Sequence, residues 1–247
     1  MKKHSIALLL LLVLLTGCGA KTEEAPWQTA YRETGKYLQE QDALSAGSVG
    51  GEWAVIGLSR AGLLSDETAQ SYEQTVEDYV KQAGSVRLHH AKSTENSRAI
   101  LGLTAAGYNA ANMAGVDLTA GLTDMAYLRA QGTNGPIWAL IALDCHGYDI
   151  PQCADGEEQT TCEGLVAEIL SYQCSDGGWA LMGDESDVDM TAMALTSLAP
   201  YQEETDIKAA VDAPLTYLSD AQQADGGFMS WGAANSESLS LIHISEP

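Results

Sequence analysis

A pattern that recurs about every 45 residues constrains the fold of this chain more than any other feature. In each copy, an aromatic or aliphatic residue precedes a second aliphatic residue, and Gln follows two to four positions later. The pairs are Tyr37-Leu38, Tyr79-Val80, Tyr127-Leu128, Ile169-Leu170 and Tyr217-Leu218, at spacings of 42 or 48 residues. Five evenly spaced copies predict a repeat protein, in which each unit buries its apolar face against its neighbours.

Each copy lies at the end of a predicted amphipathic helix. A helix with a single apolar face is expected on the outside of an assembly, with that face turned to the core. In the second copy, Ala69, Tyr72, Val76 and Tyr79 recur at helical spacing. The segments between the copies are apolar on nearly every side and predict buried helices at 53–58, 99–106, 137–143 and 190–198. Most end at a turn signal, namely Gly62, Gly107, Gly147 and Pro200. The repeat unit is therefore a helix pair, in an open solenoid or a closed ring.

The turns decide between these architectures. Gln173, Gly177 and Trp179 fit the motif Gln-x-x-x-Gly-x-Trp, and 222–228 repeats it with Phe228 in place of Trp. This motif resembles the QW repeat of terpenoid cyclases and protein prenyltransferases, which fold as α/α toroids. The resemblance spans residues 30–238 and implies an all-α fold, an α/α toroid of repeated helix pairs that is incomplete at its C-terminal end. The Gln and the aromatic residue are expected to hold neighbouring repeats together.

The N-terminus is typical of a bacterial lipoprotein. Lys2 and Lys3 precede an apolar run at 6–15, and Leu15-Thr16-Gly17-Cys18 resembles a lipobox. We expect a signal peptide at 1–17, a lipidated Cys18 that begins a linker at 18–29, and an extracytoplasmic chain anchored to the cell membrane. The net charge of −22 disfavours nucleic acid as a partner. A surface this acidic is not attracted to anionic lipid headgroups either, so we expect the acyl chains to provide the attachment.

The C-terminal residues 239–247 match the translation of a common transposon-type sequencing adapter at all nine positions. We therefore expect the native sequence to stop near Ser238 and a C-terminal domain to be missing from this chain. The last inner helix is expected to begin near Asn235, where this tail follows.

In α/α toroids the ligand cavity opens near one set of inner-helix ends. The residues that enter the inner helices are accordingly the candidates for ligand binding: Trp53, Asn96, Trp138, Asp187, Asp189, Asn235 and Glu237. A polar residue at such a position can instead serve only as a helix N-cap.

The segment that begins at Asp187 resembles the DxDDTA motif of class II terpenoid cyclases, and Asp189 matches the catalytic acid. Met190 replaces the third Asp, and the chain has a single Phe for a carbocation-stabilising wall. Both differences disfavour catalysis. The alternative is a doubly acidic helix N-terminus that the helix dipole stabilises.

No metal or cofactor is expected. Calcium at Asp184, Asp187 and Asp189 is the alternative, although their order lacks an EF-hand pattern. Zinc is disfavoured because Asp144, Cys145 and His146 are consecutive and fan around a helix. Four cysteines remain after lipidation, and an even number in an exported protein favours disulfides. We expect Cys153–Cys162 and Cys145–Cys174, with buried free thiols as the alternative.

The segments 135–143 and 189–195 are similar to toroid modules of bacterial surface proteins that are often paired with a transcobalamin-like domain. Corrinoid carriers also use an α/α ring. The resemblance implies a membrane-anchored lipoprotein module that binds a small molecule, corrinoid- or isoprenoid-like, without catalysis. The alternatives are a terpenoid cyclase- or prenyltransferase-like enzyme with Asp189 as acid, and a purely structural surface domain. Fold resemblance alone does not choose between them.

Overall fold

The computed structural model describes residues 25–41, 44–48, 50–230 and 232–238. This part of the chain is mostly helical, and one two-stranded sheet is its only sheet, which confirms the predicted all-α class. The chain divides into two compact units, Met1–Glu40 and Gln41–Pro247. The predicted repeat domain starts at residue 30, so its first helix belongs to the smaller unit.

The described part of the smaller unit is a single helix, α2 (Pro26–Gln39). Proline at its first position suits a helix start, because its fixed φ is helical and its missing N–H would have no partner there. The Gln28 side chain accepts a hydrogen bond from the Ala25 backbone N–H at 2.9 Å, which satisfies the donor just before the helix.

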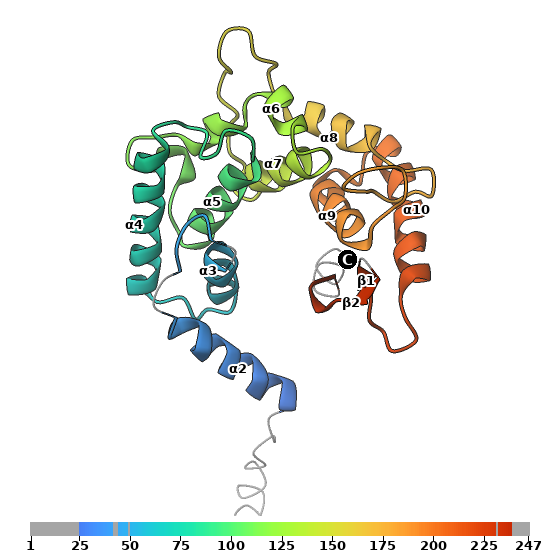
Figure 1. The fold of residues 1–247 in the computed structure, drawn as a ribbon, viewed down its shortest axis with the longest axis horizontal. Coiled ribbons are helices and arrows are strands. Elements are labelled where there is room, and N and C mark those ends of the chain that lie inside the picture. Colours follow the sequence, from blue (N-terminus) through green and yellow to red (C-terminus); the bar gives the residue numbers. More distant parts are fainter. Residues whose placement is uncertain (1–24, 42–43, 49, 231, 239–247) are drawn as a thin grey trace, which may run out of the picture. The chain divides into compact units, whose positions relative to one another are not determined.

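Four helices of the larger unit follow one another in direct contact, as Figure 1 shows. They are α3 (Gly51–Arg60), α5 (Thr94–Ala105), α7 (Asn134–Asp144) and α9 (Val188–Leu198), which coincide with the four predicted buried helices. Gly62, Gly107 and Gly147 follow the first three at positive φ, where a residue without a side chain is least strained. Ile100, Leu103, Ile137 and Leu140 are fully buried in the main core.

Three further helices pack against this series: α4 (Asp66–Ala83) on α3, α8 (Cys162–Ser171) on α7 and α10 (Thr205–Ala221) on α9. Helix α4 buries Ala69, Tyr72, Val76 and Val80, so the apolar face that the sequence predicts is the one that packs. Ser65 caps its start through a hydrogen bond from the Thr68 N–H.

The third repeat departs from the predicted pattern. In place of one outer helix it has η1 (Ala110–Asn112), η2 (Leu118–Leu122) and α6 (Met125–Arg129). Asn109, Asp117 and Asp124 each accept a hydrogen bond from the backbone N–H two residues on, and each starts a new short segment. Side chains that bond to their own backbone compete with a continuous helix, which accounts for the interruption.

The predicted turn motif holds neighbouring repeats together. Gln173 Nε2 donates to the Gly177 carbonyl at 2.7 Å and to the Ala210 carbonyl of α10 at 2.8 Å. Trp179 is fully buried and donates its indole N–H to the Ile169 carbonyl at 2.7 Å. The second copy of the motif forms a weaker connection, because among the described residues the Gln222 side chain bonds within its own turn, to the Gly226 carbonyl. The structural roles expected for these residues are confirmed at the first copy.

Two small elements complete the described part. The 3-10 helix η3 (Ala199–Tyr201) follows α9, and the hairpin strands β1 (Met229–Ser230) and β2 (Ala233–Ala234) follow the second turn motif. Phe228, just before β1, is buried in a second small apolar cluster with Val188, Ala192, Leu195 and Leu218.

Candidate functional site

Each inner helix leaves one row of side chains half-buried or exposed, at positions three or four residues apart. We call these residues the inner stripe: Trp53, Ile56, Arg60; Arg98, Leu101, Ala105; Trp138, Ile141, Cys145; and Asp189, Met193, Thr196. The first three rows adjoin one another, because residues from all of them line one cavity. The stripe is the candidate ligand surface of the larger unit.

An aromatic pair marks the end of the inner stripe at which α3 and α7 begin. The ring centroids of Trp53 and Trp138 lie 5.3 Å apart with the planes tilted by 58°. The Trp53 side chain is 42% exposed, which is unusual for a large apolar residue in direct contact with another. Two predicted ligand-binding residues from helices far apart in the sequence therefore meet, and they offer an accessible indole surface.

A buried acidic cluster starts one residue before Trp53. Glu52 is only 1% exposed, and its Oε1 accepts a hydrogen bond from the Gly47 N–H at 2.6 Å. Its Oε2 lies 3.9 Å from Arg98 Nη1 and has no hydrogen-bond partner among the described residues. Arg98 donates instead to Glu95 Oε2 at 2.6 Å. Burial raises the pKa of Glu52 above its usual range, despite the opposing effect of the Gly47 hydrogen bond and Arg98.

A cavity of about 440 Å³ opens at the other end of the same helices. Its lining combines apolar groups with one cation and a thiol: Ile56, Ser59, Arg60, Leu101, Thr104, Ala105 and Cys145. The Ser59 hydroxyl donates to the Ala105 carbonyl and presents acceptor lone pairs to a ligand, whereas the Thr104 hydroxyl, which donates to the Ile100 carbonyl, also lies 2.7 Å from the Tyr148 hydroxyl. The volume suits a small organic molecule.

The two aspartates at the start of α9 have different roles. Asp187 is the N-cap, and its Oδ1 accepts hydrogen bonds from the Asp189 and Met190 N–H groups at 3.0 Å. Asp189 Oδ2 accepts from the Ser230 hydroxyl at 3.1 Å, whereas its Oδ1 is buried with no partner in the described chain. A second cavity of about 380 Å³ lies beside Asp187, lined by Ala180, Leu181, Met182, Glu185 and Ser186.

Three other predicted ligand-binding residues are not placed for contact with a ligand at the Trp pair. Asn96 is fully buried, and backbone groups occupy its amide: it accepts from the Leu88 N–H and donates to the Val86 and Leu118 carbonyls. Asn235 Oδ1 accepts from the N–H of Glu237, whose side chain is exposed. Asn96 therefore organises the backbone, and Asn235 acts as a local turn cap.

Within the described ranges, no three His, Cys, Asp or Glu side chains come together in a group that could hold a metal ion. Of the three aspartates considered for calcium, Asp187 caps α9 through its Oδ1, and the calcium alternative stays a prediction.

Neither predicted disulfide is formed, because Cys145, Cys153, Cys162 and Cys174 are all free thiols in the structure. The Cys145 thiol donates to the Ala142 carbonyl one turn back along α7, and the Cys153 thiol lies 3.7 Å from the Glu157 carbonyl of its own loop. Burial raises the pKa of Cys162, which lies near Tyr201 and Asp144. The Cys145 and Cys153 thiols thus make local contacts with backbone carbonyls.

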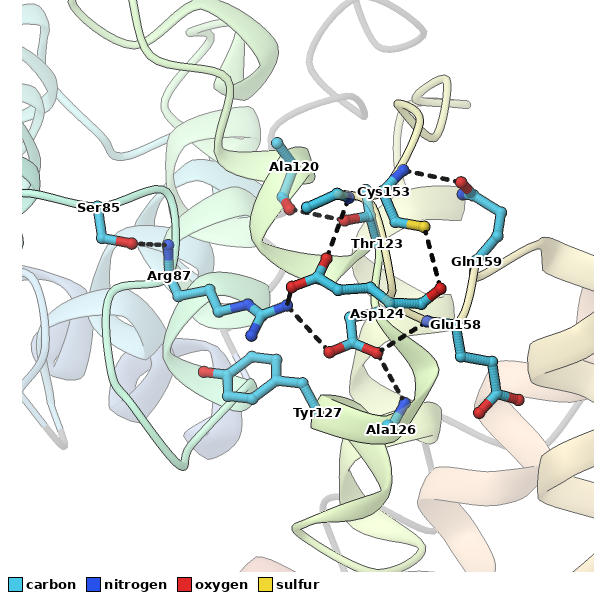
Figure 2. Close-up of polar contacts among 12 residues, drawn as sticks. Ser85, Arg87, Ala120, Thr123, Asp124, Ala126, Tyr127, Cys153, Glu158 and Gln159 are labelled. Carbon is cyan, nitrogen blue, oxygen red and sulfur yellow. Dashed lines mark hydrogen bonds and ion pairs between the residues drawn. The ribbon is translucent and has the colours of Figure 1, made fainter.

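A charged cluster that the sequence analysis missed fixes the loop between α7 and α8, as Figure 2 shows. Arg87 Nη2 donates to Asp124 Oδ2 at 3.0 Å and to Glu157 Oε1 at 2.6 Å. Its guanidinium also lies 4.5 Å from the centre of the Tyr127 ring, a cation–π contact. The sequence offered two indications of this cluster: Arg87 is one of few basic residues, and the loop that contains Glu157 is acidic.

Comparison with known proteins gives no relative for this chain: no family model, no curated protein and no solved structure matches it. Within the described residues, none of the helices combines the length and the apolar character needed to cross a membrane. The predicted lipidation site, Cys18, lies outside the described residues.

Proposed function

We propose that this chain is an extracytoplasmic lipoprotein, anchored through Cys18, whose larger unit is an α/α-toroid module that binds a small molecule without catalysis. The successive contacts of α3, α5, α7 and α9, with outer helices on three of them, support the toroid arrangement. The hydrogen bond from Gln173 to the Ala210 carbonyl of α10 also supports this arrangement, because the bond joins one repeat to the next.

The observation that carries the binding role is the aromatic pair on the inner stripe, in which Trp53 is exposed and Trp138 is half-buried. Exposed indole surface favours ligands with a flat or extended apolar body, and Ile56, Leu101 and Ile141 continue this apolar surface along the helices. A corrinoid ring or an isoprenoid chain has such a body. The cavity beside Arg60 would accept a polar end of the ligand.

Equilibrium dialysis of the full chain against cobinamide, and separately against farnesol, tests this role. Trp138→Ala should weaken binding of the accepted probe about tenfold, the equivalent of about 1.4 kcal/mol, because it removes one stacking surface. Trp27→Phe is the matched control in the other unit and should bind like the wild type. Retention of neither probe, or equal affinity of wild type and Trp138→Ala, would refute the proposed site.

One observation favours the enzyme alternative, in which Asp189 is the acid. Its Oδ1 is buried and has no hydrogen-bond partner in the described residues, so the contacts of the described chain leave one oxygen of this carboxyl group unused. Incubation with squalene or farnesyl diphosphate, followed by mass spectrometry of the extracts, separates the two functions. Product that Asp189→Asn abolishes without loss of binding would establish the enzyme, and absence of product supports the binding module.

The anchor has its own test, which does not depend on the ligand. Metabolic labelling with a clickable fatty acid should tag the wild-type protein and not Cys18→Ala. Cys145→Ala removes an exposed thiol in the larger unit and should keep the label. Equal labelling of wild type and Cys18→Ala would remove the lipoprotein assignment.

A further inference from the structure

Helix α2 is amphipathic: one of its sides is mainly apolar and the other is polar. At 100° per residue, Trp27, Ala30, Tyr31, Tyr37 and Leu38 fall on one side of the helix. The opposite side carries polar and charged residues: Gln28, Arg32, Glu33, Lys36 and Gln39. A helix with one apolar side requires an apolar surface to cover that side.

The apolar side of α2 is open to solvent in the structure. Trp27 is 67% exposed, Tyr31 53% and Tyr37 61%, and Gly35 is the one buried residue of the helix. Trp and Tyr are the side chains that concentrate where a bilayer meets water, because their rings are apolar and their N–H or O–H stays hydrated.

The short stretch of chain between Cys18 and α2 indicates that a membrane surface covers the apolar side of this helix. Pro26 lies eight positions after Cys18, which at about 3.5 Å per residue is a reach of about 28 Å at most. An acyl chain on Cys18 would therefore keep α2 at the membrane surface. The helix itself carries Arg32 and Lys36 against Glu33, a positive balance in a chain whose net charge is −22. It is thus compatible with anionic headgroups, unlike the chain as a whole.

The length of α2 excludes a spanning orientation. Its 14 residues make about 21 Å of helix, against about 30 Å for the hydrocarbon core of a bilayer. Amphipathic helices with aromatic residues on the apolar side and basic residues on the other lie in the interface plane.

We propose that α2 lies flat in the interface of the membrane that holds Cys18, with Trp27, Tyr31 and Leu38 turned toward the acyl chains. This inference rests on the proposed lipidation of Cys18. It adds a second contact beside the lipid anchor and makes α2 the element that rests on the bilayer.

Quenching by brominated lipids tests the placement in the full-length lipoprotein, reconstituted in vesicles of phosphatidylcholine and phosphatidylglycerol. Bromine on the acyl chains should quench up to about one fifth of the emission, because Trp27 is one of five tryptophans and the one placed in the interface. This loss should disappear in Trp27→Phe, which keeps the helix and an aromatic ring. Trp53→Phe is the matched control in the larger unit and should retain the quenching.

Mass spectrometry of the N-terminal peptide, done first, separates the two proposals. Absence of acylation would overturn the anchor and this inference with it. Acylation together with equal quenching in wild type and Trp27→Phe would overturn the interfacial placement alone. A second copy of the chain is the competing occupant, so a dimer in detergent that Trp27→Ser dissociates would also overturn the placement.

Discussion

The two carboxylate oxygens of Glu52 have different surroundings, and this difference governs its chemistry. One accepts the Gly47 N–H, while the other is buried 3.9 Å from Arg98 without a hydrogen bond. Arg98 is shared with Glu95 and cannot fully offset the burial. A buried carboxyl group in this situation holds its proton more tightly than in water, which is why its pKa is raised.

Glu52→Gln should therefore change how stability depends on pH. A raised pKa in the folded state means that the stabilising contribution of Glu52 is fully present below its unfolded pKa and is lost as pH rises through the folded value. Gln does not titrate, so the free energy of unfolding of Glu52→Gln should gain on that of the wild type as pH rises from the unfolded pKa of Glu52 through its raised folded pKa. Urea unfolding at several pH values measures this gain. A difference between the two proteins that stays constant with pH would contradict this prediction.

Asn96 should prove structural rather than functional. Asn96→Ala leaves the buried Leu88 N–H and the Val86 and Leu118 carbonyls without their partner. We expect a loss of about 2–4 kcal/mol in the free energy of unfolding, because each unsatisfied buried group costs about 1–3 kcal/mol and some regain water. Urea denaturation measures this loss. Normal stability with lost ligand binding would restore Asn96 to the ligand site.

Among the secondary-structure elements, the sequence predicted those that depend on residues close together in the chain. The inner helices could be predicted because their apolar runs and terminal glycines are contiguous in the sequence. The broken third repeat could not be predicted, because three Asn or Asp caps outweigh the helical pattern that ends at Tyr127-Leu128. The contact of Trp53 with Trp138 and the ion pairs of Arg87 join residues far apart in the chain. Periodicity identifies which residues face inward and leaves their partners undetermined.

The packing of α4 on α5 depends on a glycine. A Cβ on Gly102 would lie 2.2 Å from the Tyr72 hydroxyl oxygen, which is buried and has no partner in the described residues. Gly102→Ala should cost about 1–3 kcal/mol, as expected for overpacking. Tyr72→Phe removes the clashing oxygen, so the double variant should lose less than the sum of the single variants. Urea denaturation of all four proteins provides the test, and strict additivity would show that the two residues do not clash.

The whole molecule consists of two units with different roles in the proposals above. The smaller unit offers an amphipathic helix, and the larger unit offers the inner stripe. Their separation after Glu40 implies that the length of the connection matters little to the stability of the larger unit. The connections inside the larger unit are tighter, since a Cβ on Gly135 would meet the Leu128 carbonyl oxygen at 2.0 Å.

Insertions at two sites test this division. Two glycines inserted after Glu40 should leave the thermal unfolding of the larger unit unchanged. The same insertion after Gly132, between α6 and α7, should lower the melting temperature by about 4 °C or more, because it disturbs a packed junction. Differential scanning calorimetry compares the two variants. Equal effects at both sites would mean that the smaller unit is an integral part of the fold.

The double hydrogen bond of Gln173 has a consequence for how such a chain can change over generations. Its amide binds its own turn and, at the same time, the backbone of α10 in the following repeat. Because the acceptor on α10 is a main-chain carbonyl, the joint places no demand on the side chain that follows it. A duplicated segment of about 45 residues that keeps this glutamine would therefore carry the donor of the joint with it, so chains of this kind can lengthen by copying.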